Sequence, residues 1–313
     1  MLPLEGITVV SLEQAIAAPF ATRQLADLGA RVIKVERRGT GDFARHFDDV
    51  VNGLCSHFVW VNRSKESITL DIKHPEAREL LQRLIAHADV FIHNLAPGSV
   101  ERLGFGARAL REVDPRLIVC EISGYGSSGP YQHKKAYDLL VQCEAGILSI
   151  TGTPETPSKA GISVADIAAG MYAFSGILTA LFQRERTGEG ASLEVSLFES
   201  LAEWMGFPAY FTAYGGVAPP RTGSRHATIA PYGPFETGDN HTVFLAVQND
   251  REWERFCTLI LDRPDLVVDP RFARNAVRVE HWDELEPIIA SALGGRSTEQ
   301  IVSRLDGAEI ANA

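Results

Sequence analysis

Short β-branched runs alternate with helix-like segments through the first two thirds of the chain, and this alternation limits the fold more than any other feature. The opening unit has a strand from Ile7 to Leu12, a helix of small residues from Pro19 to Leu28, and a second strand from Arg31 to Glu36. Further strands are predicted at Ser67–Lys73, Ala88–Asn94, Arg116–Ser123 and Ser192–Leu197. Strands that alternate with helices in this way predict an α/β fold with a parallel sheet.

A change in composition divides the chain into two domains. Residues 215–241 are rich in Gly, Pro and Thr, which is typical of a connecting segment. We therefore predict a large domain over residues 1–214, a linker over 215–241 and a smaller α/β domain over 242–313. In the smaller domain a strand at Thr242–Val247 precedes helices that begin at Asp250, Trp282 and Thr298.

The composition is that of a globular protein that acts on small molecules. Of the 313 residues, 45% are hydrophobic and 22% are charged, and the net charge is −10. An acidic chain without a basic run is a poor match for nucleic acid or an anionic membrane. The four cysteines are widely spaced and show no paired metal-ligand pattern. Since we find neither a cationic leader nor an uninterrupted apolar run of membrane-spanning length, we expect a cytoplasmic protein with reduced thiols.

The longest apolar segment runs from Val164 to Arg184, which is too long for one strand and predicts a mostly buried helix. Asp166 lies at its start, where Asp is a preferred N-cap and where free backbone N–H groups would hold its carboxylate ionised. The same carboxylate could instead be a nucleophile at the mouth of a pocket. The residues from Ala168 to Gly170 have small side chains that would let another molecule approach closely.

Two loops are candidates for ligand binding. Residues 36–47 contain glycines and three arginines, which either face solvent or contact a phosphate. Residues 124–138 follow a buried strand, at the edge of the sheet where α/β proteins bind ligands. The chain has neither a G-x-G-x-x-G turn after its first strand nor a G-x-x-x-x-G-K-[ST] loop, so the usual dinucleotide and P-loop sites are not expected.

Several segments together resemble the family III CoA-transferases, a group that includes formyl-CoA:oxalate transferase, carnitine CoA-transferase and the α-methylacyl-CoA racemases. The matching segments, in the family's order, are LEGITVVSL, APFATRQLADLGARVIKVERRGTGD, NRSKESITLDIK, HNLAPGSVERLG, SGYGSSGPY, KAYD, VADIAAGMYAFSGILTAL, TGEGASLEVSL and DPRFARNAVR. The resemblance covers essentially the whole chain. It implies a large Rossmann-like domain, a smaller α/β domain and an interlocked homodimer.

The resemblance implies that Asp166, in VADIAAG, is a nucleophile that attacks the carbonyl of an acyl-CoA. The products would be a mixed anhydride and CoA thiolate, and the thiolate would then form an aspartyl-CoA thioester that passes CoA to an acceptor acid. Backbone N–H groups at the helix start could stabilise the developing oxyanion. We expect succinyl-CoA as the donor and a C4 or C5 dicarboxylic acid as the acceptor. CoA is then a substrate, and neither a tightly bound cofactor nor a metal is expected.

The resemblance also implies a set of CoA contacts. The positions that match CoA-binding positions of the family are Ile16, Ala17, Arg37, Leu70, Lys73, Asn94, Leu95, Arg102 and Lys135. Guanidinium and ammonium groups suit the CoA phosphates for ordinary electrostatic reasons.

Two departures from the family bear on the reaction. The racemases have a histidine directly before the aspartate of the GYG loop, where this chain has Tyr137 before Asp138. A phenol with an unperturbed pKa of about 10 is a poor base, so racemisation is disfavoured. Asp138 is then left to orient Tyr137 or a backbone group, or to act as an ordinary turn or cap residue. The glycine-run loop of formyl-CoA:oxalate transferase also has no counterpart, and Arg225, His226 or His57 is a candidate for binding the distal carboxylate of the acceptor.

Other functions stay open. A 2-methylacyl-CoA racemase would exchange the α-proton of its substrate, and a catalytically silent homologue would bind CoA without turnover. A nicotinamide oxidoreductase is disfavoured by the missing glycine turn. Because family members continue past residue 313, we expect that a C-terminal segment returning to the large domain is absent, which leaves the dimer and the activity open.

Overall fold

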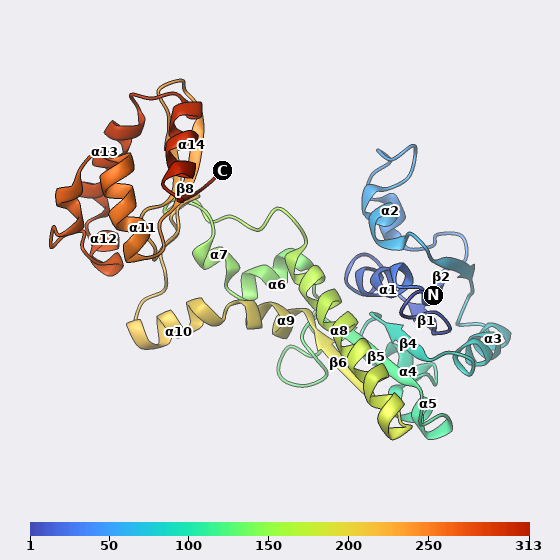
Figure 1. The fold of residues 1–313 in the computed structure, drawn as a ribbon. Helices are drawn as coiled ribbons and strands as arrows, with labels where there is room; N and C mark the ends of the chain where they lie inside the picture. Colours follow the sequence, from blue (N-terminus) through green and yellow to red (C-terminus); the bar gives the residue numbers. More distant parts are fainter. The chain divides into compact units, whose positions relative to one another are not determined.

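The computed structural model describes all 313 residues, which form two compact units (Figure 1). The first unit contains Met1–Ile147 and Lys159–Phe207, and the second contains Leu148–Ser158 and Pro208–Ala313. Residues 148–158 and 208–214, which composition alone assigns to the large domain, belong to the second unit.

The first unit is built on a six-stranded parallel sheet with the strand order β3-β2-β1-β4-β5-β6. Its strands are β1 (Thr8–Leu12), β2 (Arg31–Glu36), β3 (Glu66–Thr69), β4 (Val90–His93), β5 (Ile118–Ser123) and β6 (Ser192–Ser196). This is the doubly wound order, in which ligands bind beyond the carboxyl ends of the strands where the order reverses. The reversal lies between β1 and β4. The predicted α/β fold with a parallel sheet is confirmed.

Helices cover both faces of this sheet. One core places α1 (Ala17–Asp27) and α8 (Val164–Thr187) against Val9, Val90 and Ile118, and the other places α3 (Pro75–Ile85), α4 (Ser99–Arg102) and α5 (Ala107–Val113) against Val10 and Phe91. The helices of the N-terminal half are α1 (Ala17–Asp27), α2 (Ser56–Asn62), α3 (Pro75–Ile85), α4 (Ser99–Arg102), α5 (Ala107–Val113), α6 (Asp138–Glu144) and α7 (Ile147–Ile150), with a 3-10 turn, η1 (Phe43–His46). They are followed by α8 (Val164–Thr187), α9 (Leu197–Trp204) and α10 (Gly206–Gly215). The apolar segment after β6 therefore forms two helices, α9 and α10.

The long helix α8 packs closely on α1. A Cβ atom added at Gly170 would lie 2.7 Å from the carbonyl oxygen of Ala17 and 2.9 Å from the ring of Phe20, so only glycine fits there. The small residues after Asp166 therefore allow α1 to pack closely against α8. The prediction that they let another molecule approach is wrong. By length and composition alone α8 could cross a membrane, contrary to our expectation from the sequence, but half of its most apolar window is buried inside the protein.

The second unit has an antiparallel sheet in the order β7-β8-β9, formed by β7 (Tyr232–Glu236), β8 (Thr242–Ala246) and β9 (Ala311–Asn312). β7 lies inside the segment that composition identifies as a linker. The remaining elements are α11 (Asp250–Arg255), the π-helical turn η2 (Phe256–Ile260), the 3-10 turn η3 (Pro264–Val267), α12 (Asn275–Glu280), α13 (Trp282–Leu293) and α14 (Thr298–Gly307). Trp253, Phe256 and Leu285 belong to their shared apolar core.

Candidate active site

At the point where the strand order reverses, the side-chain amide of Asn94 is hydrogen-bonded to the backbone of Gln14, and we call this pairing the amide clamp. Gln14 follows β1 and Asn94 follows β4, so the two residues leave the sheet at the same edge. The backbone N–H of Gln14 donates to Asn94 Oδ1 at 2.9 Å, and Asn94 Nδ2 donates to the backbone oxygen of Gln14 at 2.8 Å. Two clefts open beside this clamp, and they share Gln14, Arg37, Leu95 and Ala96 in their walls.

The first cleft, of about 650 Å³, is the cationic cleft. Its basic side chains come from the loops that follow β2 and β3 and from α4, and they are Arg37, Arg38, Lys73 and Arg102. Three carboxylates also line this cleft: Glu13 is paired with Lys65, Glu36 is paired with Arg45, and Asp71 is exposed and accepts a hydrogen bond from the backbone N–H of Lys73 at 3.2 Å. Arg37, Arg38 and Lys73 have exposed side chains that are free of such pairing. The cleft therefore presents a positive wall that suits an anionic ligand.

The second cleft, of about 520 Å³, is the Asp166 cleft. Asp166 is half-buried at the start of α8, and other parts of the lining come from Gln14 and Ala15 after β1 and from the loop that ends at Tyr137. That loop is compact because Gly124 lies against Ala136, where an added Cβ would be 2.2 Å from the Ala136 Cβ. A carboxylate therefore lies in a cleft that shares walls with the cationic cleft.

Asp166 is not the N-cap of α8. The helix begins at Val164 with Ser163 as its N-cap, so Asp166 is in the first turn. The capping carboxylate is that of Asp138, which accepts hydrogen bonds from the backbone N–H groups of Ala165 at 2.8 Å and Asp166 at 3.4 Å. Its other oxygen accepts from Gln142 Nε2 at 2.6 Å. Asp138 thus orients a backbone group, one of the roles open from the sequence, and it occupies the N–H groups that we expected to stabilise an oxyanion.

Burial raises the pKa of Asp166 to about 7, and repulsion by the Asp138 carboxylate adds to the shift. The expectation that the helix start holds this carboxylate ionised is therefore wrong. The physical reason is mainly burial, and the Asp138 carboxylate, which also takes the backbone N–H groups at the helix start, is the second cause. A carboxyl pKa raised in this way is a common property of residues in reactive sites.

Comparison with known proteins now bears on this geometry. Residues 4–313 match the family model described as CoA-transferase family III. The chain belongs to this family. It is 38% identical over 293 residues to the acetyl-CoA:oxalate CoA-transferase of Acetobacter aceti, with 93% of this chain and 75% of that protein covered. It is 35% identical over 312 residues to the succinyl-CoA:glutarate CoA-transferase of Mus musculus, covering 99% of this chain and 71% of that protein.

A solved structure agrees with the family assignment. The CAIB/BAIF family protein from Brucella suis superimposes with a TM-score of 0.84 at 34% identity, covering 100% of this chain and 83% of that one. This family III CoA-transferase therefore has the same fold as a solved member over its whole described length.

The structure gathers most of the predicted CoA-binding residues of this family III CoA-transferase at the two clefts. The cationic cleft contains Arg37, Leu70, Lys73, Leu95 and Arg102. The Asp166 cleft contains Ala17, Asn94 and Lys135 together with Tyr137 and Asp138. Leu70 and Lys73 lie beyond β3, which ends at Thr69, so they form part of the loop at the carboxyl edge rather than the predicted strand end.

Four predicted residues lie elsewhere. Ile16 is 3% exposed and packs with Phe20 and Val61, outside both cleft linings. His57, on α2, has its Nδ1 3.7 Å from the carboxylate of Asp48.

Arg225 and His226 belong to the second unit. The Arg225 guanidinium lies 4.6 Å from the ring centroid of Trp282, and the His226 ring stacks on Tyr232 with centroids 5.2 Å apart. Both side chains therefore have partners within their own unit, and their proposed contact with the acceptor stays a prediction.

Sequence reasoning missed Gln14, Ala15 and His133 as lining residues of the Asp166 cleft. Gln14 and Ala15 carry a usable signal, because they directly follow the first buried strand of a doubly wound sheet. His133 has no comparable signal, because its place depends on how the loop before Tyr137 folds back.

Proposed function

We propose that this chain transfers CoA from succinyl-CoA to a small dicarboxylic acid, with Asp166 as the nucleophile. The observation that carries the proposal is the Asp166 carboxylate in a cleft whose walls continue into a cleft lined by four cationic side chains. Relatives of this chain are named for succinyl-CoA and glutarate or for acetyl-CoA and oxalate, which supports a short dicarboxylic acid as acceptor.

The proposed reaction begins when the Asp166 carboxylate attacks the acyl carbonyl of succinyl-CoA, which forms a mixed anhydride and releases CoA thiolate. The thiolate attacks the aspartyl carbonyl, which forms an aspartyl-CoA thioester and releases succinate. The acceptor carboxylate then attacks this thioester, giving a second anhydride and thiolate. Attack of the thiolate on the acceptor's acyl carbon restores Asp166 and yields the new CoA thioester. Each covalent intermediate keeps an activated carbonyl, so no step starts from an inert carboxylate.

A molecule as long as CoA would occupy both of the clefts, which share part of their walls. Its phosphates suit Arg37, Lys73 and Arg102 in the cationic cleft, since arginine and lysine bind phosphate through charge-assisted hydrogen bonds. Its thioester end would then extend past the shared wall at Gln14 into the Asp166 cleft. Lys135 lines that cleft with an exposed side chain, whereas Lys134 is already paired with Glu144.

The test is an exchange assay that follows formation of glutaryl-CoA from succinyl-CoA and glutarate, with oxalate as a second acceptor. Asp166→Asn should abolish exchange and leave CoA binding within about twofold, because the amide fills the same volume but is not a nucleophile. Glu185→Gln is the matched control, since this carboxylate is exposed on the same helix, outside both cleft linings, and its loss should have no effect. Substantial exchange by Asp166→Asn would place the nucleophile elsewhere.

Racemisation is disfavoured by the residue that precedes Asp138. Tyr137 takes that position, is 66% exposed and lines the Asp166 cleft, and a phenol is a poor base; the imidazole in this lining is that of His133, which does not precede Asp138. Incubation of 2-methylacyl-CoA in deuterated solvent should therefore give no α-proton exchange, and Tyr137→His should not create it.

We also propose a homodimer, in keeping with the family resemblance. Tyr210 and Tyr214 on α10 are 70% and 86% exposed with their ring centroids 6.3 Å apart, and such exposed aromatic groups are typical of association surfaces. Light scattering over a range of concentrations tests this, and a mass near 34.2 kDa at all of them would exclude the dimer.

A further inference from the structure

Ala15 has a strained backbone in the wall of the Asp166 cleft. Its φ is 59°, in the left-handed region, which costs an alanine about 1–2 kcal/mol because its Cβ crowds the following carbonyl. Strain of this kind persists only where the surrounding structure enforces it, and it is concentrated at functional sites. The contacts that enforce it at Ala15 are therefore informative about the site.

The segment Glu13–Gln14–Ala15 is held at every residue. Gln14 is held by the amide clamp with Asn94 on the β4 side. On the other side, the backbone N–H of Ala15 donates to Asp42 Oδ1 at 3.0 Å. Asp42 is only 1% exposed and comes from the loop after β2, which also carries Arg37. One carboxylate thus links a strained residue of the Asp166 cleft to the loop that supplies a cation to both clefts.

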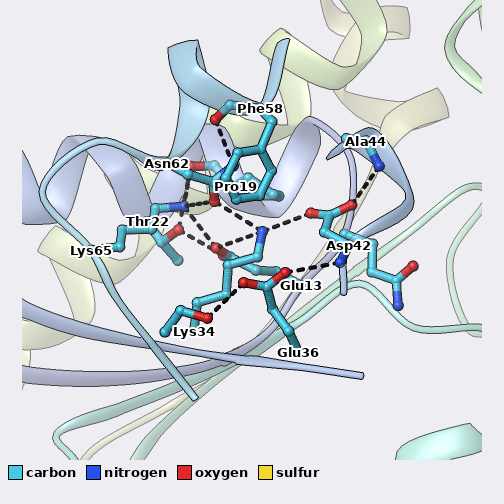
Figure 2. Close-up of polar contacts among 12 residues, drawn as sticks. Glu13, Pro19, Thr22, Lys34, Glu36, Asp42, Ala44, Phe58, Asn62 and Lys65 are labelled. Atoms are coloured by element: carbon cyan, nitrogen blue, oxygen red, sulfur yellow. Dashed lines mark hydrogen bonds and ion pairs between the residues drawn. The ribbon is translucent and has the colours of Figure 1, made fainter. Parts of the chain in front are cut away.

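Asp42 is itself fixed by a buried set of ionic contacts (Figure 2). Lys34 Nζ, on β2, donates to Asp42 Oδ2 at 2.7 Å, and the backbone N–H of Ala44 donates to Oδ1 at 2.9 Å. The backbone N–H of Asp42 donates to Glu36 Oε2 at 2.9 Å. Arg45 in turn binds Glu36 through two hydrogen bonds of 2.8 Å each. The carboxylate of Asp42 therefore has a single possible position relative to β2.

The same buried group of charged residues also contacts Glu13, the first residue of the segment Glu13–Gln14–Ala15. Lys65 Nζ donates to Glu13 Oε1 at 2.7 Å and to Asn62 Oδ1 at 3.1 Å. Lys34 Nζ lies 3.7 Å from Glu13 and donates to Asn62 Oδ1 at 2.9 Å. Buried ion pairs contribute little net stability, because desolvation offsets their attraction. Because these buried ion pairs contribute little net stability and lie next to the lining of the Asp166 cleft, we infer that they hold the cleft's backbone in position.

We propose that Asp42 is a positioning residue for the CoA-transfer site, which holds Ala15 in its left-handed conformation so that Gln14 and Ala15 keep their places in the lining of the Asp166 cleft. This inference rests on the proposed reaction at Asp166. Asp42 acts through the backbone of Ala15 and does not touch the substrate itself. Its effect should therefore appear in the rate of the first covalent step more than in the folding of the first unit.

The test compares two variants that both remove the buried charges of Lys34 and Asp42. Lys34→Met/Asp42→Asn keeps an oxygen that can accept from Ala15, and Lys34→Met/Asp42→Leu has the same branching at Cγ without that oxygen. Loss of Lys34 leaves no other group unpaired, because Glu13 and Asn62 both keep Lys65 as a donor. A third variant adds Ala15→Gly to the leucine pair, since glycine adopts positive φ without the penalty of a Cβ.

The readouts are the single-turnover rate of Asp166 labelling by succinyl-CoA with hydroxylamine trapping, the Kd for CoA and the melting temperature. We expect labelling by the leucine variant to be at least about tenfold slower than by the asparagine variant, with both melting cooperatively, since small misplacements cost rates of this order or more. Ala15→Gly should recover part of that loss, which a merely structural defect would not show.

Equal labelling rates in the asparagine and leucine variants would overturn the proposal, as would failure of Ala15→Gly to recover any activity. If wild-type protein is not labelled at all, the proposed reaction has failed, and the Kd then decides the positioning role. Several-fold weaker CoA binding by the leucine variant alone, again relieved by Ala15→Gly, would support it. Equal affinities in all three variants would contradict it.

Discussion

Asp166 and Asp138 form a pair in which one carboxylate holds the backbone and the other is available to react. Since burial and the charge of Asp138 both raise the pKa of Asp166 to about 7, the anion that the proposed reaction requires forms as the pH rises through that value. The single-turnover labelling rate with succinyl-CoA should therefore increase from pH 5 to pH 8 with a midpoint at about 7.

Asp138→Asn separates the two causes of this shift. The amide oxygen can still accept from Ala165, but the repelling charge is gone, so the pKa of Asp166 and the midpoint of the labelling profile should both fall. Glu144→Gln is a useful control, because it removes a carboxylate of the same helix that instead pairs with Lys134. An unchanged midpoint in Asp138→Asn would show that burial alone sets the pKa.

The raised pKa also predicts how stability depends on pH. Between pH 4 and pH 7 the folded chain keeps a proton on Asp166 that the unfolded chain loses, so this residue lowers stability progressively as the pH rises. Asp166→Asn mimics the protonated acid and should raise the melting temperature more at pH 8 than at pH 4. A gain of about 2–4 °C is expected for each kcal/mol relieved. Thermal melts at both pH values measure the difference, and equal gains would contradict the pKa shift.

The sequence located Asp166 but could not give its electrostatic state. Its place at the start of a long apolar helix follows from residue pattern, and its role as nucleophile came with the family resemblance. The pKa depends on Asp138, which is 28 residues away and reaches α8 only because α6 packs beside it. A contact between distant segments has no local signal in the sequence.

At the scale of elements, the fit of α8 on α1 is what holds Asp166 beside the sheet's reversal point. Gly170→Ala should destabilise the first unit by about 1–3 kcal/mol, because the added Cβ would lie 2.7 Å from the backbone oxygen of Ala17, which cannot rotate away. Gly176→Ala on the same helix is the matched control. Its Cβ would lie 3.5 Å from Leu193 Cδ1, an ordinary contact, so the better helix propensity of alanine should make it neutral or stabilising.

Urea unfolding of the two alanine variants measures this difference. A Gly170→Ala protein as stable as Gly176→Ala would show that α1 moves away from α8 at little cost. The close packing of these helices would then not be what fixes the position of Asp166.

The sequence predicted well those helices and strands that have a clear local residue pattern. It did not predict a strand that is recognised only by its hydrogen bonds to a neighbouring strand. β1, α1 and β2 match their predicted segments because β-branched runs and a proline-initiated helix are local features. β7 was taken for linker because its sequence contains Gly233 and Pro234. It is an edge strand of the order β7-β8-β9, where a proline costs no hydrogen bond to a second neighbour.

At the scale of the whole molecule, two separate apolar cores predict two separable responses to mutation. Leu285 is fully buried in the core of the second unit, so Leu285→Ala should cost that unit about 2–5 kcal/mol. CoA affinity should stay within about twofold, because every residue that lines the two clefts belongs to the first unit. Fluorescence of the buried Trp253 reports the unfolding of the second unit.

Leu25→Ala is the matched control for the first unit, since Leu25 is equally buried on α1. It should lower the stability of the first unit and leave the Trp253 transition in place. Loss of CoA binding in Leu285→Ala would contradict the assignment of the whole CoA site to the first unit.

The central claim is that Asp166 carries the acyl group and then CoA, and mass spectrometry after incubation with succinyl-CoA and a hydroxylamine quench tests it most directly. Trypsin releases the segment from Ala160 to Arg184, in which Asp166 is the only acidic side chain, and it releases Asp138 in a different peptide. We predict a hydroxamate on the Asp166 peptide of the wild-type protein and none in Asp166→Asn. An unmodified Asp166 peptide in protein that binds CoA, or a hydroxamate on the Asp138 peptide instead, would contradict the account.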